Sequence, residues 1–241
     1  MLKLLKKIIR KKTGSCAAVI VAAGSSNRMK GTDKILHPID GEPLIVHTIR
    51  IFQQCCRIDE IIIVTRGELI AQIQQLCDEH GFDKVLKVTA GGASRAESVM
   101  NGLDQVSKNM QYVAVHDGAR PFVTDQIIRL TLEKAIEYHA AAPAVPVKDT
   151  IKMAYGNLVT HTPDRACLFA VQTPQIFDFD LLRGALSKVL QDGISVTDDC
   201  SVVETLGMSV YLTQGSDENI KITTPTDLIL AQAIWDRRQH L

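Results

Sequence analysis

The sequence shows no excess of either charge, because 27 Lys and Arg residues balance 27 Asp and Glu residues over 241 positions. A nucleic-acid partner is therefore not expected, since binding to nucleic acid takes a basic patch or stripe. No apolar stretch reaches the roughly 18 residues that suggest a transmembrane helix. No apolar run within residues 1–12 exceeds two residues, so we expect no signal peptide. Residues 1–15 are interpreted as a basic arm, for which solvation is favoured over contact with a membrane.

Motifs of several common site types are also missing. The six cysteines include no Cys-x-x-Cys pair, which disfavours zinc and redox sites. Most of them lie in apolar segments, so we expect free thiols in a reducing, cytoplasmic location. The loop at Gly24 matches neither Gly-x-x-x-x-Gly-Lys-Ser/Thr nor Gly-x-Gly-x-x-Gly. The missing second and third glycines disfavour a dinucleotide-dependent oxidoreductase.

The most informative segment is an apolar run over residues 17–23 that ends at Gly24. A continuous apolar run is typical of a strand buried on both faces, as in a parallel sheet. Arg28, Lys30 and Lys34 follow in a small polar loop, where a polyphosphate would meet cations. On residue types alone, an ordinary strand-to-loop turn with surface cations remains an alternative.

Strand-like and helix-like patterns then alternate along the chain, which predicts an α/β fold with a doubly wound, mostly parallel sheet. Ligands of such sheets bind beyond the carboxyl ends of the strands. Gly24, Gly91 and Asp117 each follow a predicted strand, so we expect them at one rim. We expect strands over residues 17–23, 60–65, 85–88, 112–115, 209–213 and 219–223, and helices over 43–55, 68–80, 94–106, 124–139, 180–191, 198–206 and from 225.

Residues 146–174 break this alternation. Two strand-like segments, 149–154 and 158–162, flank Tyr155-Gly156-Asn157, which favours a β-hairpin. We expect this hairpin to form an arm that projects from the sheet. No linker marks a second domain, so residues 16–241 are interpreted as one domain.

Several motifs in register resemble the methylerythritol phosphate cytidylyltransferase family of nucleotidyltransferases, which belongs to the non-mevalonate isoprenoid pathway. The resemblance covers residues 17–235. It rests on Ala22-Ala23-Gly24-Ser25-Ser26-Asn27-Arg28-Met29 with Lys34, Gly91-Gly92-Ala93-Ser94-Arg95-Ala96-Glu97-Ser98-Val99, His116-Asp117-Gly118-Ala119-Arg120-Pro121, Asp149-Thr150-Ile151-Lys152, Thr173-Pro174-Gln175, Thr197-Asp198-Asp199 and Asn219-Ile220-Lys221-Ile222-Thr223.

The resemblance implies a Rossmann-like nucleotidyltransferase fold. It also implies that CTP and methylerythritol 4-phosphate react to give the diphosphocytidyl product and pyrophosphate, with Mg²⁺ as cofactor. It implies a homodimer formed through the hairpin arm. The implied catalytic residues are Arg28 and Lys34 at the α-phosphate, with Arg165 and Lys221 at the acceptor phosphate. The implied nucleotide-binding residues are Ala22, Ala23, Gly24, Ser25, Gly92, Arg95 and Ser98. The implied acceptor-binding residues are Asp117, Arg120, Thr150, Thr173 and Thr197, with Asp117 also holding the metal.

Without the resemblance, several of these residues have simpler interpretations. Asp117 is compatible with capping a turn, and Lys221 with a solvated strand edge. His116 is interpreted as a packed, hydrogen-bonding histidine rather than a base. Asp198 and Asp199 suit the positive end of a helix dipole.

Two positions depart from the pattern of many relatives. Asp33 stands before Lys34 in place of Pro, and Ala93 follows Gly92 in place of an acid. The change at position 33 affects how the loop that carries Lys34 is held. The change at position 93 affects how the cytosine base is recognised. Two other functions remain open: a ribitol 5-phosphate cytidylyltransferase, and a nucleotide-binding module without catalysis.

Overall fold

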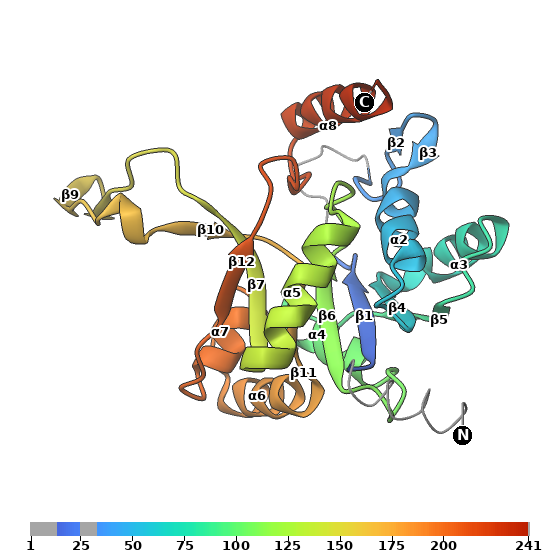
Figure 1. Cartoon of the computed structure of the whole chain (residues 1–241), viewed down its shortest axis with the longest axis horizontal. Helices are drawn as coiled ribbons and strands as arrows, with labels where there is room; N and C mark the ends of the chain where they lie inside the picture. Colours follow the sequence, from blue (N-terminus) through green and yellow to red (C-terminus); the bar gives the residue numbers. More distant parts are fainter. Residues whose placement is uncertain (1–13, 25–32, 241) are drawn as a thin grey trace.

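The computed structural model describes residues 14–24 and 33–240, and Figure 1 shows a central sheet with helices on both faces. The strands of this sheet are β1 (Cys16–Val21), β4 (Glu60–Thr65), β5 (Val85–Ala90), β6 (Tyr112–Asp117), β7 (Ala140–Pro146), β10 (Phe169–Val171), β11 (Gln175–Asp178) and β12 (Tyr211–Gln214). The α-helices are α2 (Leu44–Gln54), α3 (Ile70–Glu79), α4 (Arg95–Leu103), α5 (Asp125–Tyr138), α6 (Phe179–Asp192), α7 (Asp199–Glu204) and α8 (Pro225–Gln239).

The strand order is β10-β7-β11-β6-β1-β4-β5, with β12 also pairing with β7. The pairs β1–β6, β1–β4, β4–β5 and β7–β12 are parallel. Strand β11 runs antiparallel to both β6 and β7, and β10 runs antiparallel to β7. The predicted α/β class with a mostly parallel, doubly wound sheet is therefore confirmed, and the antiparallel strands are an addition to it.

Strand β1 shows why its sequence is apolar throughout. Successive side chains of a strand point to opposite faces. Ala18 and Ile20 pack with the core on the side of α2, α3 and α5. Ala17 and Val19 pack with the core on the side of α4, α6 and α7. Both faces of β1 are thus covered, and a polar residue at any of these positions would be buried without a partner.

A two-stranded hairpin, β8 (Met153–Tyr155) and β9 (Leu158–His161), lies on the arm that projects from the sheet in Figure 1. The 3-10 turn η3 (Arg165–Cys167) follows it. The ends of the expected 146–174 arm belong to the sheet, because Pro146 and Val145 of β7 pair with Phe169 and Ala170 of β10. The projecting part is therefore residues 147–168.

The expected strand over residues 219–223 is wrong. This segment is extended but joins no sheet. Two bonds tie it to the loop after β6: the Ile222 amide donates to the Ala119 carbonyl at 2.9 Å, and Arg120 Nη1 donates to the Asn219 carbonyl at 2.6 Å. Ile222 is buried in a small core beneath α8, together with Leu44 and Phe122. Tertiary packing, not a ladder of strand bonds, holds the segment in place.

The cysteines are all free thiols, and Cys16, Cys55, Cys77 and Cys200 are buried. Within residues 14–24 and 33–240, no helix is long and apolar enough to cross a bilayer. The basic arm expected at the N-terminus falls almost entirely on residues 1–13, outside the described part of the chain.

Two helical glycines give a test of how tightly α4 packs on the sheet. A Cβ added at Gly102 would lie 2.5 Å from Val19 Cγ1 and 2.8 Å from Val64 Cγ2. We predict that Gly102→Ala destabilises the fold by about 1–3 kcal/mol, because overpacking outweighs the better helix propensity of alanine. The matched control is Gly184→Ala in α6, where a Cβ meets nothing within 4 Å. Gly184→Ala should stabilise by about 0.5–1 kcal/mol. Urea unfolding of both variants checks this, and a neutral or stabilising Gly102→Ala would contradict the tight packing.

Candidate active site

A cavity of about 420 Å³ opens at the carboxyl ends of β1 and β6, which is where the sheet topology places a ligand. Its charged lining residues among those described are three cations and one carboxylate, so the cavity carries excess positive charge. An anionic ligand suits such a site better than a neutral one. The cavity is lined by Val21, Ala22, Ala23, Gly24, Lys34, Ile35, Gly92, Ala93, Ser94, Arg95, Ser98, Asp117, Ala119 and Lys221.

The loops that border the cavity are tied to neighbouring strands through their backbones. The Ala22 amide donates to Val64 O at 2.7 Å, and the Gly91 amide donates to Thr65 O at 2.8 Å. Close approach of these loops requires a residue without a side chain, because a Cβ on Gly91 would lie 2.5 Å from the Ala23 Cβ. The loop after β1 and the loop at Gly91 are therefore in direct contact, as expected for two loops at one rim of the sheet.

The helix α4 begins at this rim and points its N-terminus at the cavity. The hydroxyl of Ser94 caps it by accepting from the Glu97 amide at 3.1 Å. The carboxylate of Glu97 accepts from the Ala93 amide at 2.7 Å. Ser98 Oγ accepts from the Gly92 amide at 3.0 Å and donates to Ser94 O at 2.9 Å. The Gly-Gly loop is thus held in one conformation by side chains of the helix that follows it.

Asp117, the last residue of β6, is the electrostatic centre of the site. Its Oδ2 lies 2.8 Å from Lys221 Nζ and 3.5 Å from Arg120 Nε, and its Oδ1 lies 3.7 Å from an Arg95 guanidinium nitrogen. Burial alone would raise the pKa of Asp117, but these cations, Lys221 above all, outweigh it and hold the pKa at about 2. Asp117 is therefore ionised, and it is more than the turn cap that its position also suggested. Lys221 is likewise more than a solvated cation.

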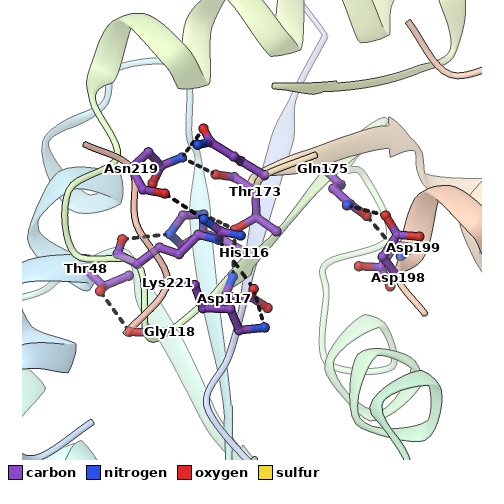
Figure 2. Close-up of polar contacts among 12 residues, drawn as sticks. Thr48, His116, Asp117, Gly118, Thr173, Gln175, Asp198, Asp199, Asn219 and Lys221 are labelled. Atoms are coloured by element: carbon purple, nitrogen blue, oxygen red, sulfur yellow. Dashed lines mark hydrogen bonds and ion pairs between the residues drawn. The ribbon is translucent and has the colours of Figure 1, made fainter. Parts of the chain in front are cut away.

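A chain of buried hydrogen bonds fixes the backbone of Asp117, as Figure 2 shows. The Asp117 amide donates to Thr173 Oγ1 at 3.1 Å, and that hydroxyl lies 3.0 Å from His116 Nδ1. The other ring nitrogen of His116 lies 3.2 Å from Arg120 O, which can only accept. Burial lowers the pKa of His116 to about 4, so the ring is neutral, with its proton on Nε2. The interpretation of His116 as a packed, hydrogen-bonding residue is confirmed.

Asp199 is a residue whose partner the sequence did not reveal. It is fully buried at the start of α7, and its Oδ2 lies 2.7 Å from an Arg95 guanidinium nitrogen. Burial raises the pKa of Asp199, whereas Asp117 is held well below its usual range. The side chain of Gln175 positions this helix start, because its oxygen accepts from the amides of Asp199 and Cys200 at 3.0 Å each. Figure 2 shows Gln175 facing both aspartates.

Asp198 has the simpler role that its position suggests. Its Oδ1 accepts from the Ser201 amide at 2.9 Å and caps α7, and its Oδ2 accepts from Gln175 Nε2 at 2.8 Å. The only sequence signal that separates Asp198 from Asp199 is that the first residue precedes the helix and the second lies inside it. Arg95, the partner of the buried Asp199, is about a hundred positions away in the sequence, so no local pattern reveals the pair.

The sheet rim therefore brings together most of the candidate residues, but not all of them. Arg120 and Thr173 lie just behind Asp117 and do not line the cavity. Thr197 is exposed before α7, and Thr150 and Arg165 are exposed on the arm, where Arg165 donates to Lys148 O at 2.9 Å. Ser25 and Arg28 lie outside the described residues. The candidates that line the cavity are Ala22, Ala23, Gly24, Lys34, Gly92, Arg95, Ser98, Asp117 and Lys221.

Comparison with known proteins agrees with this geometry. Residues 16–237 match the family model described as 2-C-methyl-D-erythritol 4-phosphate cytidylyltransferase. A protein of that name from Caldanaerobacter subterraneus is 45% identical over 219 residues, which is 90% of this chain and 96% of the relative. Another from Halalkalibacterium halodurans is 43% identical over 225 residues, covering 93% and 98%.

Solved structures give the same result at the level of the fold. A 4-diphosphocytidyl-2C-methyl-D-erythritol synthase from Anaerococcus prevotii has a TM-score of 0.84 and 29% identity, covering 93% of this chain and 97% of that one. The cytidylyltransferase from Thermus thermophilus has a TM-score of 0.75 and 31% identity, covering 90% and 98%. The chain belongs to the 2-C-methyl-D-erythritol 4-phosphate cytidylyltransferase family.

Proposed function

We propose that the cavity at the strand rim joins CTP to 2-C-methyl-D-erythritol 4-phosphate, giving 4-diphosphocytidyl-2-C-methyl-D-erythritol and pyrophosphate. The observation that carries this is the gathering of Lys34, Arg95 and Lys221 around one cavity in a chain of this family. A phosphate oxygen of the acceptor forms the new bond to the α-phosphorus, and the bond to the bridging oxygen of the leaving pyrophosphate breaks.

The reaction does not need a general base. A phosphate monoester has its second pKa near about 6, so the acceptor already carries most of its negative charge at neutral pH. The neutral His116 is enclosed by Thr173 and Arg120 and has no free nitrogen for proton transfer. The difficulty lies in bringing two anions together, and preorganised cations reduce it.

In this proposal Lys34 stabilises charge at the α-phosphate, together with Arg28, which lies outside the described residues. Lys221 positions the acceptor phosphate. The N-terminus of α4 and the loops at Gly24 and Gly92 provide backbone amides for the nucleotide. The support is that Lys34 and Lys221 both line the cavity while they come from segments far apart in the sequence.

Mg²⁺ is proposed as the cofactor, with Asp117 as its protein ligand. No group of three or more His, Cys, Asp or Glu side chains in the described part of the chain could hold a metal by itself. Magnesium usually takes one or two carboxylates together with substrate phosphates and waters. The ionised Asp117 lines the cavity and supplies one such carboxylate, whose Oδ1 lies 3.7 Å from an Arg95 guanidinium nitrogen. When bound, the ion would neutralise charge on the phosphates.

The site is proposed to be completed by a second copy of the chain. The arm exposes large apolar side chains, with Tyr155 at 88% and Leu158 at 79% of their surface, and an isolated hairpin is marginal in water. A two-fold dimer is the commonest way to cover such a surface. In the dimer, Thr150 and Arg165 of one copy would reach the acceptor phosphate in the other.

The acceptor is the first test of this function. With Mg²⁺ and CTP, pyrophosphate release should be faster with methylerythritol 4-phosphate than with ribitol 5-phosphate, because the chain belongs to the former enzyme family. The measurement compares kcat/KM for the two acceptors under the same conditions. A higher value for ribitol 5-phosphate would contradict the acceptor, and no release with either would favour a binding module.

The second test addresses Lys34. We expect Lys34→Ala to lower kcat by about 10²-fold or more, the cost of losing one preorganised donor to the transition state. The KM for CTP should change much less. Lys108→Ala removes an exposed lysine from the loop before β6, at the opposite end of that strand from the cavity, and this matched control should retain its activity. A Lys34→Ala variant with an intact kcat and a raised KM would indicate uniform binding instead.

The third test addresses the metal. Asp117→Asn should shift the Mg²⁺ titration of activity to higher concentration, because a neutral amide is a poorer ligand for a hard cation. Asp125→Asn, at an exposed carboxylate in the first turn of α5, is the control and should leave the titration unchanged. Overlay of the Asp117→Asn and wild-type titrations would mean that Asp117 does not hold the metal.

The fourth test addresses the shared site. Arg165→Ala chains are mixed with Lys34→Ala chains, each of which should be nearly inactive alone. If the two residues meet across a dimer interface, each mixed dimer contains one intact site and one doubly defective site. Its activity should rise toward half that of the wild type. No recovery, with subunit exchange verified by differently tagged chains, would place Arg165 at its own copy's site.

A further inference from the structure

Arg66 lies at the same rim of the sheet as the cavity but does not line it, and it has no role in the proposed reaction. It is the residue that follows β4, where the strand's last carbonyls accept the amides of both neighbouring rim loops. Its own carbonyl accepts from the Leu69 amide at 3.0 Å, at the start of the 3-10 turn η2 (Gly67–Leu69). The backbone of Arg66 is thus fixed on both sides.

The guanidinium of Arg66 joins three parts of the rim. It forms an ion pair with the carboxylate of Asp33, donates from Nη1 to Gly24 O at 3.5 Å, and donates from Nε to Glu68 at 2.8 Å. Arg66 is 25% exposed and Asp33 is 19% exposed, whereas Glu68 is 68% exposed. The contact with Asp33 is therefore the one that water screens least.

Asp33 in turn shapes the turn that carries Lys34. Its Oδ1 accepts from the Ile35 amide at 3.2 Å, and its carbonyl accepts from the Leu36 amide at 3.2 Å. Ile35 is buried, and its carbonyl accepts from the Ile45 amide at 2.9 Å. Lys34 therefore stands between one neighbour anchored in the core and another anchored to Arg66.

We propose that Arg66, acting through Asp33, is a positioning residue that sets Lys34 against the nucleotide phosphates. A guanidinium suits this role because its planar donors can hold a carboxylate and a carbonyl together. The aspartate before Lys34 is then one half of an ion pair that orients the lysine loop. The inference rests on the proposed function of Lys34.

A double-mutant cycle tests the inference. Arg66→Met keeps an unbranched apolar stem and removes the guanidinium, and we expect kcat to fall about 10-fold, since small misplacements of reacting groups cost up to about 10²-fold. In a Lys34→Ala background the same substitution should lower kcat less than about 2-fold, because the lysine that it positions is gone. Glu68→Gln, which removes the charge of the exposed partner of Arg66, is the matched control and should retain wild-type kcat.

The outcomes separate the inference from the function on which it rests. Suppose that Lys34→Ala lowers kcat as proposed, but that Arg66→Met lowers kcat by the same factor in the wild-type and the Lys34→Ala backgrounds. Arg66 then does not act through the lysine, and the inference is overturned. If Arg66→Met loses stability in urea but keeps its kcat, the ion pair is only structural, which also overturns it. If Lys34→Ala keeps its kcat, the proposed role of Lys34 fails, and the inference fails with it.

Discussion

The buried carboxylate of Asp117 is the interaction on which the site depends. Lys221, Arg95 and Arg120 come from three different segments, and their positive charges would repel one another if they met without a counterion. Asp117 faces all three, at 2.8 to 3.7 Å. The cations are therefore gathered before any substrate binds. Such preorganisation is what makes charge stabilisation effective in catalysis, because no reorganisation has to occur during the reaction.

The fold keeps Asp117 in place from two sides. Thr173, in the connection between β10 and β11, holds the Asp117 backbone, because β11 runs antiparallel beside β6. Two residues further on, Gln175 holds the start of α7, so that Asp199 can pair with Arg95. The Thr-Pro-Gln motif therefore supports both carboxylates of the site. Thr173 does not itself line the cavity, but its bond to Asp117 helps to set the geometry of the cavity wall.

Sequence patterns predicted the features that depend on local residue types. The apolar run of β1 and the alternation of strands with helices are of this kind, and so is the position of Asp117 at a strand end. The features that were missed depend on contacts between distant segments. Residues 219–223 have the composition of a strand, but their partners are the core beneath α8 and Ala119 rather than a ladder.

Long-range ion pairs could not be predicted from the sequence either, because they also depend on contacts between distant segments. Asp199 looks like an ordinary first-turn acid, and only the packing of α7 shows that its carboxylate is buried against Arg95. Asp33 looked like a departure from a motif, and only the end of β4 shows that it has a partner in Arg66. In both cases the fold brings together charges that are far apart in the chain.

A crystal structure of the protein with CTP and Mg²⁺ tests most directly whether Asp117 organises the site. We expect the triphosphate in the cavity between Lys34 and the N-terminus of α4, the metal on Asp117, and the bond from the Asp117 amide to Thr173 unchanged. A triphosphate bound outside this cavity, or a metal held without Asp117, would contradict this expectation.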